Sequence, residues 1–337
     1  MKKYQQLAEQ LREQIASGIW QPGDRLPSLR DQVALSGMSF MTVSHAYQLL
    51  ESQGYIIARP QSGYYVAPQA IKMPKAPVIP VTRDEAVDIN TYIFDMLQAS
   101  RDPSVVPFAS AFPDPRLFPL QQLNRSLAQV SKTATAMSVI ENLPPGNAEL
   151  RQAIARRYAL QGITISPDEI VITAGALEAL NLSLQAVTEP GDWVIVENPC
   201  FYGALQALER LRLKALSVAT DVKEGIDLKA LELALQEYPV KACWLMTNSQ
   251  NPLGFTLTPQ KKARLVALLN QYNVTLIEDD VYSELYFGRE KPLPAKAWDH
   301  HDGVLHCSSF SKCLVPGFRI GWVAAGKHAR KIQRLQL

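Results

Sequence analysis

Long apolar runs are missing from this chain, although hydrophobic residues make up 47% of its 337 residues. No stretch approaches the roughly 18 apolar residues that a membrane-spanning helix needs. Lys2 and Lys3 near the N-terminus are followed by polar residues and not by the apolar segment of a signal peptide. We therefore expect a cytoplasmic protein with no membrane partner.

Cysteine and net charge are scarce too. The four cysteines, Cys200, Cys243, Cys307 and Cys313, show no C-x-x-C spacing, so the pattern predicts reduced thiols and no metal site. The formal net charge is only +2, and charge alone therefore points neither to nucleic acid nor to a membrane surface. The apolar content is sufficient for a sizeable core, and the length predicts two or more domains.

The first seventy residues predict a compact helical module. Leu7, Leu11 and Ile15 recur every four positions and form one face of a helix that ends at Gly18. Ser28 is a suitable N-cap for a second helix, and Ser39 for a third. The third helix is predicted at about 40–53, and strands at 55–58 and 64–66 follow it around a turn at 60–63. This order is that of a winged helix-turn-helix, with a small three-helix packing module as the alternative.

Three motifs in this region decide between these interpretations. P-G-D-R-L-P-S-L-R, T-V-x-x-A-Y-x-x-L-E-x-x-G-Y and R-P-x-S-G-Y-Y-V resemble the GntR-type DNA-binding domain over its whole length. The resemblance implies that the start of the third helix enters the major groove of double-stranded operator DNA, and that the wing lies on the backbone or in the minor groove. The contacts it implies are Arg30 at a phosphate, Ser39, Met41, Thr42, Ser44 and His45 on the helix, and Arg59, Gln61 and Ser62 on the wing.

The DNA-binding pattern departs from the family in two places. Many GntR members carry an arginine early in the recognition helix, where this chain has Phe40 and Ser44, and a wing glycine where it has Gln61. Six lysines and arginines against five acidic residues give residues 1–67 a net charge of only +1. We expect modest affinity for each half-site, which makes a homodimer more necessary.

Four prolines between Ala67 and Thr82 predict an extended linker. The predicted domains are therefore 1–67, a linker at 68–83, and 84–337, with a helix from Asp84 to about Ser100. Beyond it, helices and strands alternate, which predicts an α/β fold with a mostly parallel sheet covered on both faces and sites at the strand carboxyl ends. Strands are predicted at 169–173, 193–196, 213–218, 242–247, 274–278 and 304–306, and helices at 148–161, 177–187, 228–238 and 259–272.

One lysine in the last predicted strand-to-loop segment is surrounded by small hydroxyls. Lys312 lies in S-S-F-S-K-C-L-V-P-G-F-R-I-G-W, which runs from Ser308 to Trp322. A lysine that forms a Schiff base must be held away from water and used partly as the free amine. Ser309 and Ser311 could bond phosphate oxygens, and Arg319 could pair with them as a forked donor. An ordinary serine-rich loop with a solvated lysine is the alternative.

Other strand ends carry further candidates. The backbone N–H groups of Ala176 and Leu177 would form an anion site at a helix N-terminus, and Asn251 could donate to a ring hydroxyl. Asp279 could face a pyridine nitrogen and keep it protonated, with Tyr282 at the ring oxygen. Each feature alone is a common turn or acidic loop, but the order G-A, N-P-x-G, D-x-x-Y, S-x-S-K along one chain favours the joint interpretation.

Together these motifs resemble the fold-type I aminotransferases, which use pyridoxal 5'-phosphate. The resemblance implies that Lys312 forms the imine with this cofactor, that Asp279 faces the ring nitrogen, and that Asn251 and Tyr282 face the ring oxygen. It further implies that Ser309, Arg319, Gly175 and Ala176 hold the phosphate, and that Phe201 stacks on the ring.

A GntR-type domain ahead of an aminotransferase-like domain resembles the MocR subfamily of bacterial transcription regulators. This resemblance implies a homodimeric regulator that senses pyridoxal phosphate, or a small amine or amino-acid effector, through the imine at Lys312. A working aminotransferase with a fused DNA-binding domain, and a dimerisation platform that has lost the cofactor, are the alternatives. Family members continue into a small C-terminal domain that supplies an arginine for a substrate carboxylate. Only about one helix follows Trp322 here, so we expect either that the sequence is incomplete or that this site is missing.

Overall fold

The computed structural model describes residues 2–60, 62–68, 93–94, 98, 111, 113–139 and 143–337. The chain divides into two compact units between Pro77 and Val78, a point inside the predicted linker. Linker residues 69–83, most of the helix predicted at 84–100, and the wing residue Gln61 lie outside the described residues. None of the described helices is long and apolar enough to cross a bilayer.

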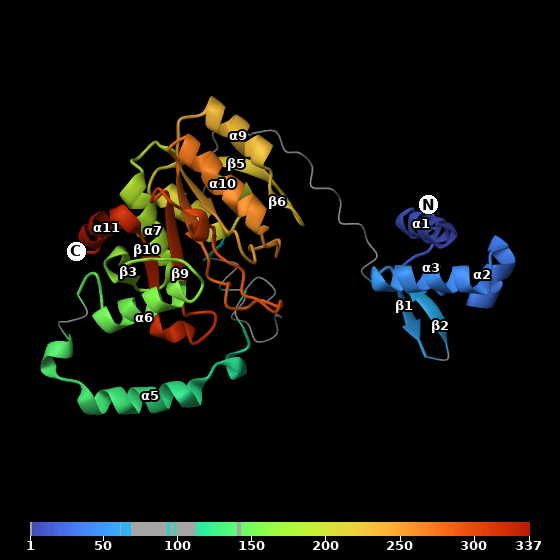
Figure 1. Ribbon diagram of the computed structural model, residues 1–337, viewed down its shortest axis with the longest axis horizontal. Coiled ribbons are helices and arrows are strands. Elements are labelled where there is room, and N and C mark those ends of the chain that lie inside the picture. The colour runs from blue at the N-terminus through green and yellow to red at the C-terminus, as the bar shows by residue number, and fades with distance from the viewer. Residues whose placement is uncertain are drawn as a thin grey trace. The chain divides into compact units, whose positions relative to one another are not determined.

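The first unit has the predicted winged layout (Figure 1). Its helices are capped locally, since Ser28 and Ser39 each accept the backbone N–H three residues further on, and Gly37 ends the second helix in the left-handed conformation. Tyr47 is fully buried in the core, and its hydroxyl donates to the Pro27 carbonyl at 2.9 Å. The elements are α1 (Lys3–Ala16), α2 (Leu29–Ser36), α3 (Phe40–Ser52), β1 (Ile56–Arg59) and β2 (Gly63–Val66).

The described part of the second unit is built on an eight-stranded sheet with the order β3-β10-β9-β8-β7-β4-β5-β6. Strands β5, β4, β7, β8 and β9 run parallel, which confirms the predicted mostly parallel sheet. Strand β10 is antiparallel to both its neighbours, and β6 folds back on β5; neither was predicted. The strands are β3 (Ile170–Thr173), β4 (Trp193–Asn198), β5 (Lys214–Asp221), β6 (Gly225–Ile226), β7 (Val240–Leu245), β8 (Thr275–Asp279), β9 (Val304–Ser309) and β10 (Gly321–Ala324).

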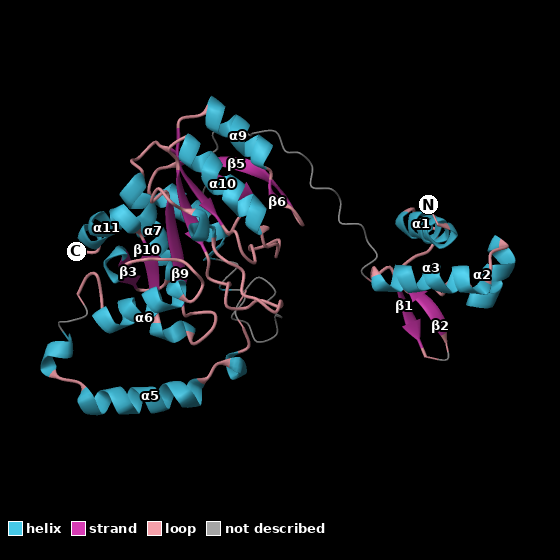
Figure 2. Ribbon diagram, viewed as in Figure 1, coloured by secondary structure: helices cyan, strands magenta, loops and turns pink. Residues whose placement is uncertain are grey.

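Helices cover both faces of this sheet (Figure 2). Successive side chains of a strand point to opposite faces, so Ile277 of β8 packs in one core cluster and Leu276 in the other. One face carries α7 (Ala176–Val187), α8 (Tyr202–Arg210) and α11 (Ala329–Leu335), and the other carries α6 (Ala148–Ala159), α9 (Leu228–Glu237) and α10 (Pro259–Gln271). Helix α5 (Leu120–Thr133) buries none of its residues. Helices α5 and α8 were not predicted.

Short 3-10 turns complete the described elements: η1 (Pro115–Leu117), η2 (Ala136–Val139), η3 (Pro167–Glu169), η4 (Ala295–Trp298), η5 (Pro316–Phe318) and η6 (Gly326–His328). Turn η5 leads directly from the lysine segment into β10. It ends at Arg319, whose backbone is left-handed with φ of 52°. The predicted cofactor-site residues therefore lie at or after the carboxyl ends of β3, β4, β7, β8 and β9, with Arg319 just before β10, and the two helical layers hold these strands in place.

Candidate functional site

Lys312 lies just beyond the carboxyl end of β9, next to residues that follow β8. Its Nζ is 5.6 Å from the centroid of the Tyr282 ring and donates to the Ala111 carbonyl at 3.1 Å. Burial lowers the pKa of Lys312, and the charge of Asp279 opposes that shift. A lowered pKa raises the fraction of neutral amine, which is the form that attacks a carbonyl.

Asp279 ends β8 and is buried. Burial raises the pKa of its carboxyl group to about 7. The nearby Trp244 indole and the Val281 N–H oppose this shift, and the charge of Asp280 adds to it. Its Oδ1 atom is buried and has no hydrogen-bond partner among the described residues, and the same holds for Nε1 of nearby Trp244. A buried acceptor without a donor is costly, so this position fits the N–H of a protonated pyridine ring.

Tyr282 and Asn251, both predicted at the ring oxygen, lie together. The Asn251 side-chain amide donates to the Tyr282 hydroxyl over 3.4 Å. Burial, followed by the charge of Asp279, raises the pKa of Tyr282 to about 12, so the phenol stays protonated and can donate to a ring oxygen. Tyr202 also contributes to this shift. Tyr202 was missed in the sequence because no motif marks it apart from its neighbour Phe201.

Phe201 lies at the start of α8, in the segment that follows β4. Its ring centroid is 4.6 Å from that of Tyr202, with the planes inclined by 49°. A Cβ atom on Gly203 would come within 2.4 Å of the Phe201 ring, so this glycine makes room for the aromatic side chain. The predicted stacking residue is thus held by its own helix, and its neighbour is close to Tyr282.

The loop between β3 and α7 forms the opposite end of the site. Gly175 precedes α7 with φ of 95°, and no side chain caps this helix. Arg319 donates from Nη2 to the Ala174 carbonyl at 3.2 Å, and a Cβ on Gly175 would lie only 2.6 Å from this nitrogen. The uncapped N–H groups of Ala176 and Leu177 and one guanidinium are groups that could hold a phosphate-sized anion.

Two further contacts shape this anion site. The Ala174 N–H donates to the Glu178 carboxylate, and the Ala174 carbonyl accepts from Arg319, so the peptide groups on both sides of Ala174 are held. Ser309 and Ser311 are both buried, and the Ser311 N–H donates to the Ser309 hydroxyl at 3.4 Å. Glu178 was not predicted as a site residue, because a glutamate in the first turn of a helix is common.

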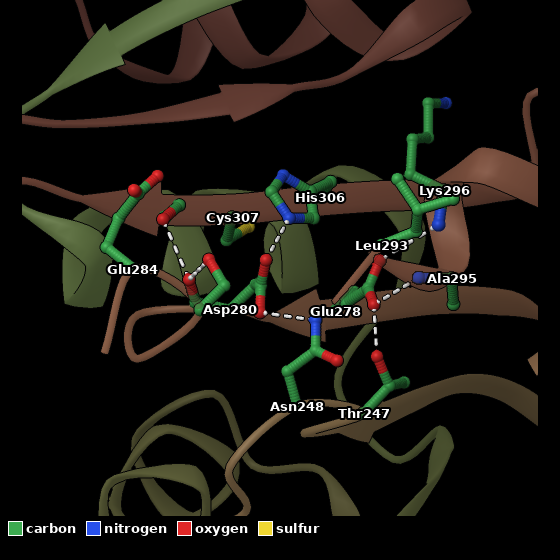
Figure 3. A network of polar contacts seen from close by, with 12 residues as sticks. Thr247, Asn248, Glu278, Asp280, Glu284, Leu293, Ala295, Lys296, His306 and Cys307 are labelled. Carbon is green, nitrogen blue, oxygen red and sulfur yellow. Dashed lines mark hydrogen bonds and ion pairs between the residues drawn. The ribbon is translucent and has the colours of Figure 1, made fainter. Parts of the chain in front are cut away.

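The carboxylates on either side of Asp279 are paired with donors (Figure 3). Glu278 accepts from the Thr247 hydroxyl at 2.5 Å and from the backbone N–H groups of Ala295 at 2.6 Å and Lys296 at 3.0 Å. Asp280 accepts from the Asn248 amide at 3.0 Å and faces the imidazole Nε2 of His306 at 2.9 Å. Of these three adjacent carboxylates, only Asp279 has an oxygen that the described residues leave without a donor.

The predicted DNA contacts in the first unit are on its surface. Arg30 and His45 are exposed, and Met41 is 61% exposed near the start of α3, where Thr42 and Ser44 are half-buried. The described wing residues are also ordered by local contacts, because the Arg59 guanidinium lies 4.3 Å from the Tyr65 ring centroid and the Ser62 hydroxyl is 2.6 Å from that of Tyr65. Ser39 is occupied as the N-cap of α3, and its Oγ lies 2.9 Å from Thr42 Oγ1.

Comparison with known proteins supports both halves of this description. Residues 3–66 match the model of bacterial regulatory proteins of the gntR family, and residues 114–336 match that of aminotransferase class I and II. The chain is 99% identical to the HTH-type transcriptional regulator YdcR of Escherichia coli (strain K12) and 38% identical to YjiR of the same organism. Both matches cover all 337 residues of the chain and 72% of the relative.

Solved structures resemble the sheet unit. A multiple substrate aminotransferase from Thermococcus profundus has a TM-score of 0.66 and 30% identity, covering 72% of this chain and 62% of that one. The alpha-aminoadipate aminotransferase LysN of Thermus thermophilus, solved with N-(5'-phosphopyridoxyl)-L-leucine, has a TM-score of 0.60 and 29% identity, covering 67% and 59%. The chain spans about three fifths of the length of these structures. It belongs to the aminotransferase class I and II family and carries a GntR-family helix-turn-helix domain ahead of that fold, which is the architecture of MocR-type regulators.

Proposed function

We propose that this chain is a DNA-binding transcription regulator that depends on pyridoxal phosphate. The observation that carries the proposal is the buried Oδ1 of Asp279, an acceptor without a donor among the described residues that lies at the lysine-bearing end of the sheet. The chain begins with a winged helix-turn-helix unit, and its relatives over the full length are named transcriptional regulators. A cofactor site and a DNA-binding unit on one chain support a sensor that acts on a promoter.

The residues around Asp279 would contact different parts of the cofactor. Pyridoxal phosphate, when bound, supplies an electrophilic carbonyl and a ring that withdraws electrons. The Lys312 amine, whose pKa is lowered by burial, would hold that carbonyl, and Asp279 would accept a hydrogen bond from the ring nitrogen. The remaining roles fall to Tyr282 and Asn251 at the ring oxygen, Phe201 on the ring face, and Gly175, Ala176, Leu177, Ser309, Ser311 and Arg319 at the phosphate.

Regulation requires a ligand with different affinity for two arrangements of the protein. A small amine or amino acid that took the place of Lys312 at the cofactor would leave the lysine free to make the contacts with Ala111 and Tyr282 that it makes in this structure. A homodimer would present two winged units to two half-sites of operator DNA. It would also offset the weak electrostatic attraction of a unit with a net charge of only +1 over residues 1–67.

The cofactor part of this proposal is tested by absorption spectroscopy. We expect the purified full chain to show the visible band of lysine-bound pyridoxal phosphate, which Lys312→Ala abolishes and the control Lys327→Ala, on the surface near His301, retains. An unchanged spectrum in Lys312→Ala would refute the assignment of this lysine.

The regulatory part of the proposal is tested by DNA binding. Footprinting upstream of the protein's own gene, with cofactor-loaded and cofactor-free protein, should show protection that changes with loading or with one member of an amino-acid panel. Rapid consumption of an amino acid with no change in protection would indicate the working aminotransferase instead.

A further inference from the structure

A buried chain of hydrogen bonds runs behind the cofactor site and plays no part in the roles assigned above. The Trp322 indole donates from Nε1 to the Tyr158 hydroxyl at 2.9 Å, and this oxygen lies 2.5 Å from Nδ1 of His306. The other imidazole nitrogen, Nε2, lies 2.9 Å from Oδ2 of Asp280. The chain connects β10, α6, β9 and the end of β8, and all four side chains are buried.

Counting donors fixes the direction of this chain. Tyr158 stays protonated because burial raises its pKa well above the ordinary value, and its oxygen already accepts the Trp322 N–H. Its own proton needs an acceptor, and the acceptor that the described contacts offer is Nδ1 of His306. The imidazole proton then lies on Nε2 and is donated to Asp280. A proton on Nδ1 instead would leave two acceptors facing each other, and a cationic imidazole would leave the buried tyrosine proton without a partner.

Asp280 collects donors from several directions. Its Oδ1 accepts from the Asn248 amide and its Oδ2 faces the N–H of His306 Nε2, so both oxygens act as acceptors and the group is an anion. Asn248 can donate to this anion because its own carbonyl is taken by the buried ammonium of Lys262 at 2.5 Å. The Ser308 hydroxyl donates to the Asp280 backbone carbonyl at 2.8 Å. The residue directly after Asp279 is therefore held on both side-chain oxygens and on its backbone.

We propose that His306 is a positioning residue of the cofactor site. The hydrogen bonds donated from Trp322 to Tyr158 and from Tyr158 to His306 fix its imidazole as the neutral Nε2–H tautomer. Its Nε2–H then holds Asp280 in place, so that the adjacent Asp279 keeps its free oxygen toward the ring nitrogen. The same chain reaches the phosphate end, because Trp322 follows Gly321, and a Cβ on Gly321 would lie 2.5 Å from the Gly175 carbonyl carbon. Both ends of the site are thus tied to one buried imidazole. The tautomer stands on the described contacts alone, whereas the positioning role rests on the function proposed above.

The tautomer is tested without any cofactor. Histidine-selective nitrogen-15 labelling of the full chain gives signals from only five histidines, and those absent from His306→Gln belong to His306. We expect a protonated Nε2 and an unprotonated Nδ1 at neutral pH. A cationic ring or a proton on Nδ1 would refute the proposed direction of these hydrogen bonds. In Tyr158→Phe the proton given to Nδ1 is lost, so the single form should give way to a mixture; an unchanged single tautomer would show that Asp280 alone fixes the ring.

The positioning role is tested with a matched pair of variants of full-length protein loaded with pyridoxal phosphate. His306→Gln keeps an N–H donor near the place of Nε2, whereas His306→Leu keeps the bulk and removes the donor. We expect His306→Leu to weaken cofactor binding by about tenfold or more, as loss of a hydrogen bond to a buried charge implies, and to shift the absorption maximum, while His306→Gln stays within about threefold of the parent.

Equal losses in the two variants, or no loss in either, would reject the positioning role. If His306→Leu fails to fold, the tautomer signals still test the hydrogen-bond chain, and a loss of cofactor affinity beyond about threefold in His306→Gln would still reject the positioning role. A parent protein without any cofactor band refutes the proposed function instead and leaves the tautomer result standing.

Discussion

The winged unit and the sheet unit hold their candidate residues in opposite ways. The predicted DNA contacts Arg30, Met41 and Arg59 are exposed, whereas Asp279 is buried with a pKa raised to about 7 and Lys312 is half-buried with a lowered pKa. The sheet unit therefore prepares its chemistry in its own interior, before any ligand arrives. The winged unit gains its function only when a partner supplies the opposing charge. Substitutions should accordingly change stability and cofactor binding in one unit, and DNA affinity in the other.

The largest expected difference concerns folding of the sheet unit. A methyl group at Gly321 would lie 2.5 Å from the Gly175 carbonyl carbon, whereas one at Gly317 meets nothing within 4 Å. We expect Gly321→Ala to lower the free energy of unfolding of the sheet unit by about 3 kcal/mol and Gly317→Ala to change it little. Denaturant unfolding of cofactor-free protein measures both. The transition of the winged unit should be the same in the two variants, and parallel shifts of both units would mean that they do not fold separately.

The next prediction concerns how the stability of the sheet unit depends on pH. Burial raises the pKa of Asp279 to about 7 and that of Glu197 to about 8, so the native sheet unit retains protons that the unfolded chain has released. Its stability in the cofactor-free state should therefore fall as pH rises from about 4 to about 8. Asp279→Asn removes one of the two groups and should reduce the fall by at most about 1.4 kcal/mol per pH unit.

Thermal unfolding of the sheet unit across this pH range checks the expectation, with Glu197→Gln as the variant that removes the other group. If the pH dependence of stability stays the same in Asp279→Asn, the Asp279 carboxyl group does not take up a proton in this pH range on folding. A rise of stability with pH would contradict the raised pKa of both groups.

Most of the winged unit could be predicted from the sequence because its determinants are local. Ser28, Gly37 and Ser39 set the helix ends within a few residues of themselves, and the structure has them in those roles. Strand β10 was missed for the opposite reason. It is four residues long, begins at Gly321, and pairs with β3, about 150 residues earlier in the chain. No local signal reports such a pairing.

The same distinction between local and long-range determinants applies to the candidate site. Motif order predicted Asp279, Tyr282, Asn251 and Lys312 on neighbouring loops because the carboxyl ends of parallel strands meet at one edge of a sheet. The contact between Arg319 and Ala174 and the hydrogen bonds through His306 depend on how α6, α7, β9 and β10 pack. Side chains that act through another residue carry no motif of their own, so only the packed structure reveals them.

A smaller effect should appear in the winged unit alone. If Arg30 contacts a phosphate, Arg30→Ala should weaken DNA binding by about tenfold for every sequence tried. The slope of log affinity against log salt concentration should become shallower by about one. Arg12→Ala is the matched control, since Arg12 pairs with Glu9 on α1 and is not among the predicted contacts. Fluorescence anisotropy at several salt concentrations measures both variants. Loss at one operator with none at others would show that Arg30 reads bases, because phosphate contacts position the protein without specifying sequence.

The smallest effect decides what Ser39 does. Its hydroxyl accepts the Thr42 N–H at 3.3 Å as the N-cap of α3, although the family resemblance also implies that it contacts DNA. As a cap, Ser39→Ala should cost the winged unit about 1 kcal/mol of stability, as should Ser28→Ala at the start of α2. Ser39→Asp restores the cap and adds a negative charge at the DNA-facing end, so it should recover the stability and lose affinity. A Ser39→Ala variant that keeps its full stability but binds DNA poorly would instead make the hydroxyl a direct contact, because the lost group would then matter only in the complex.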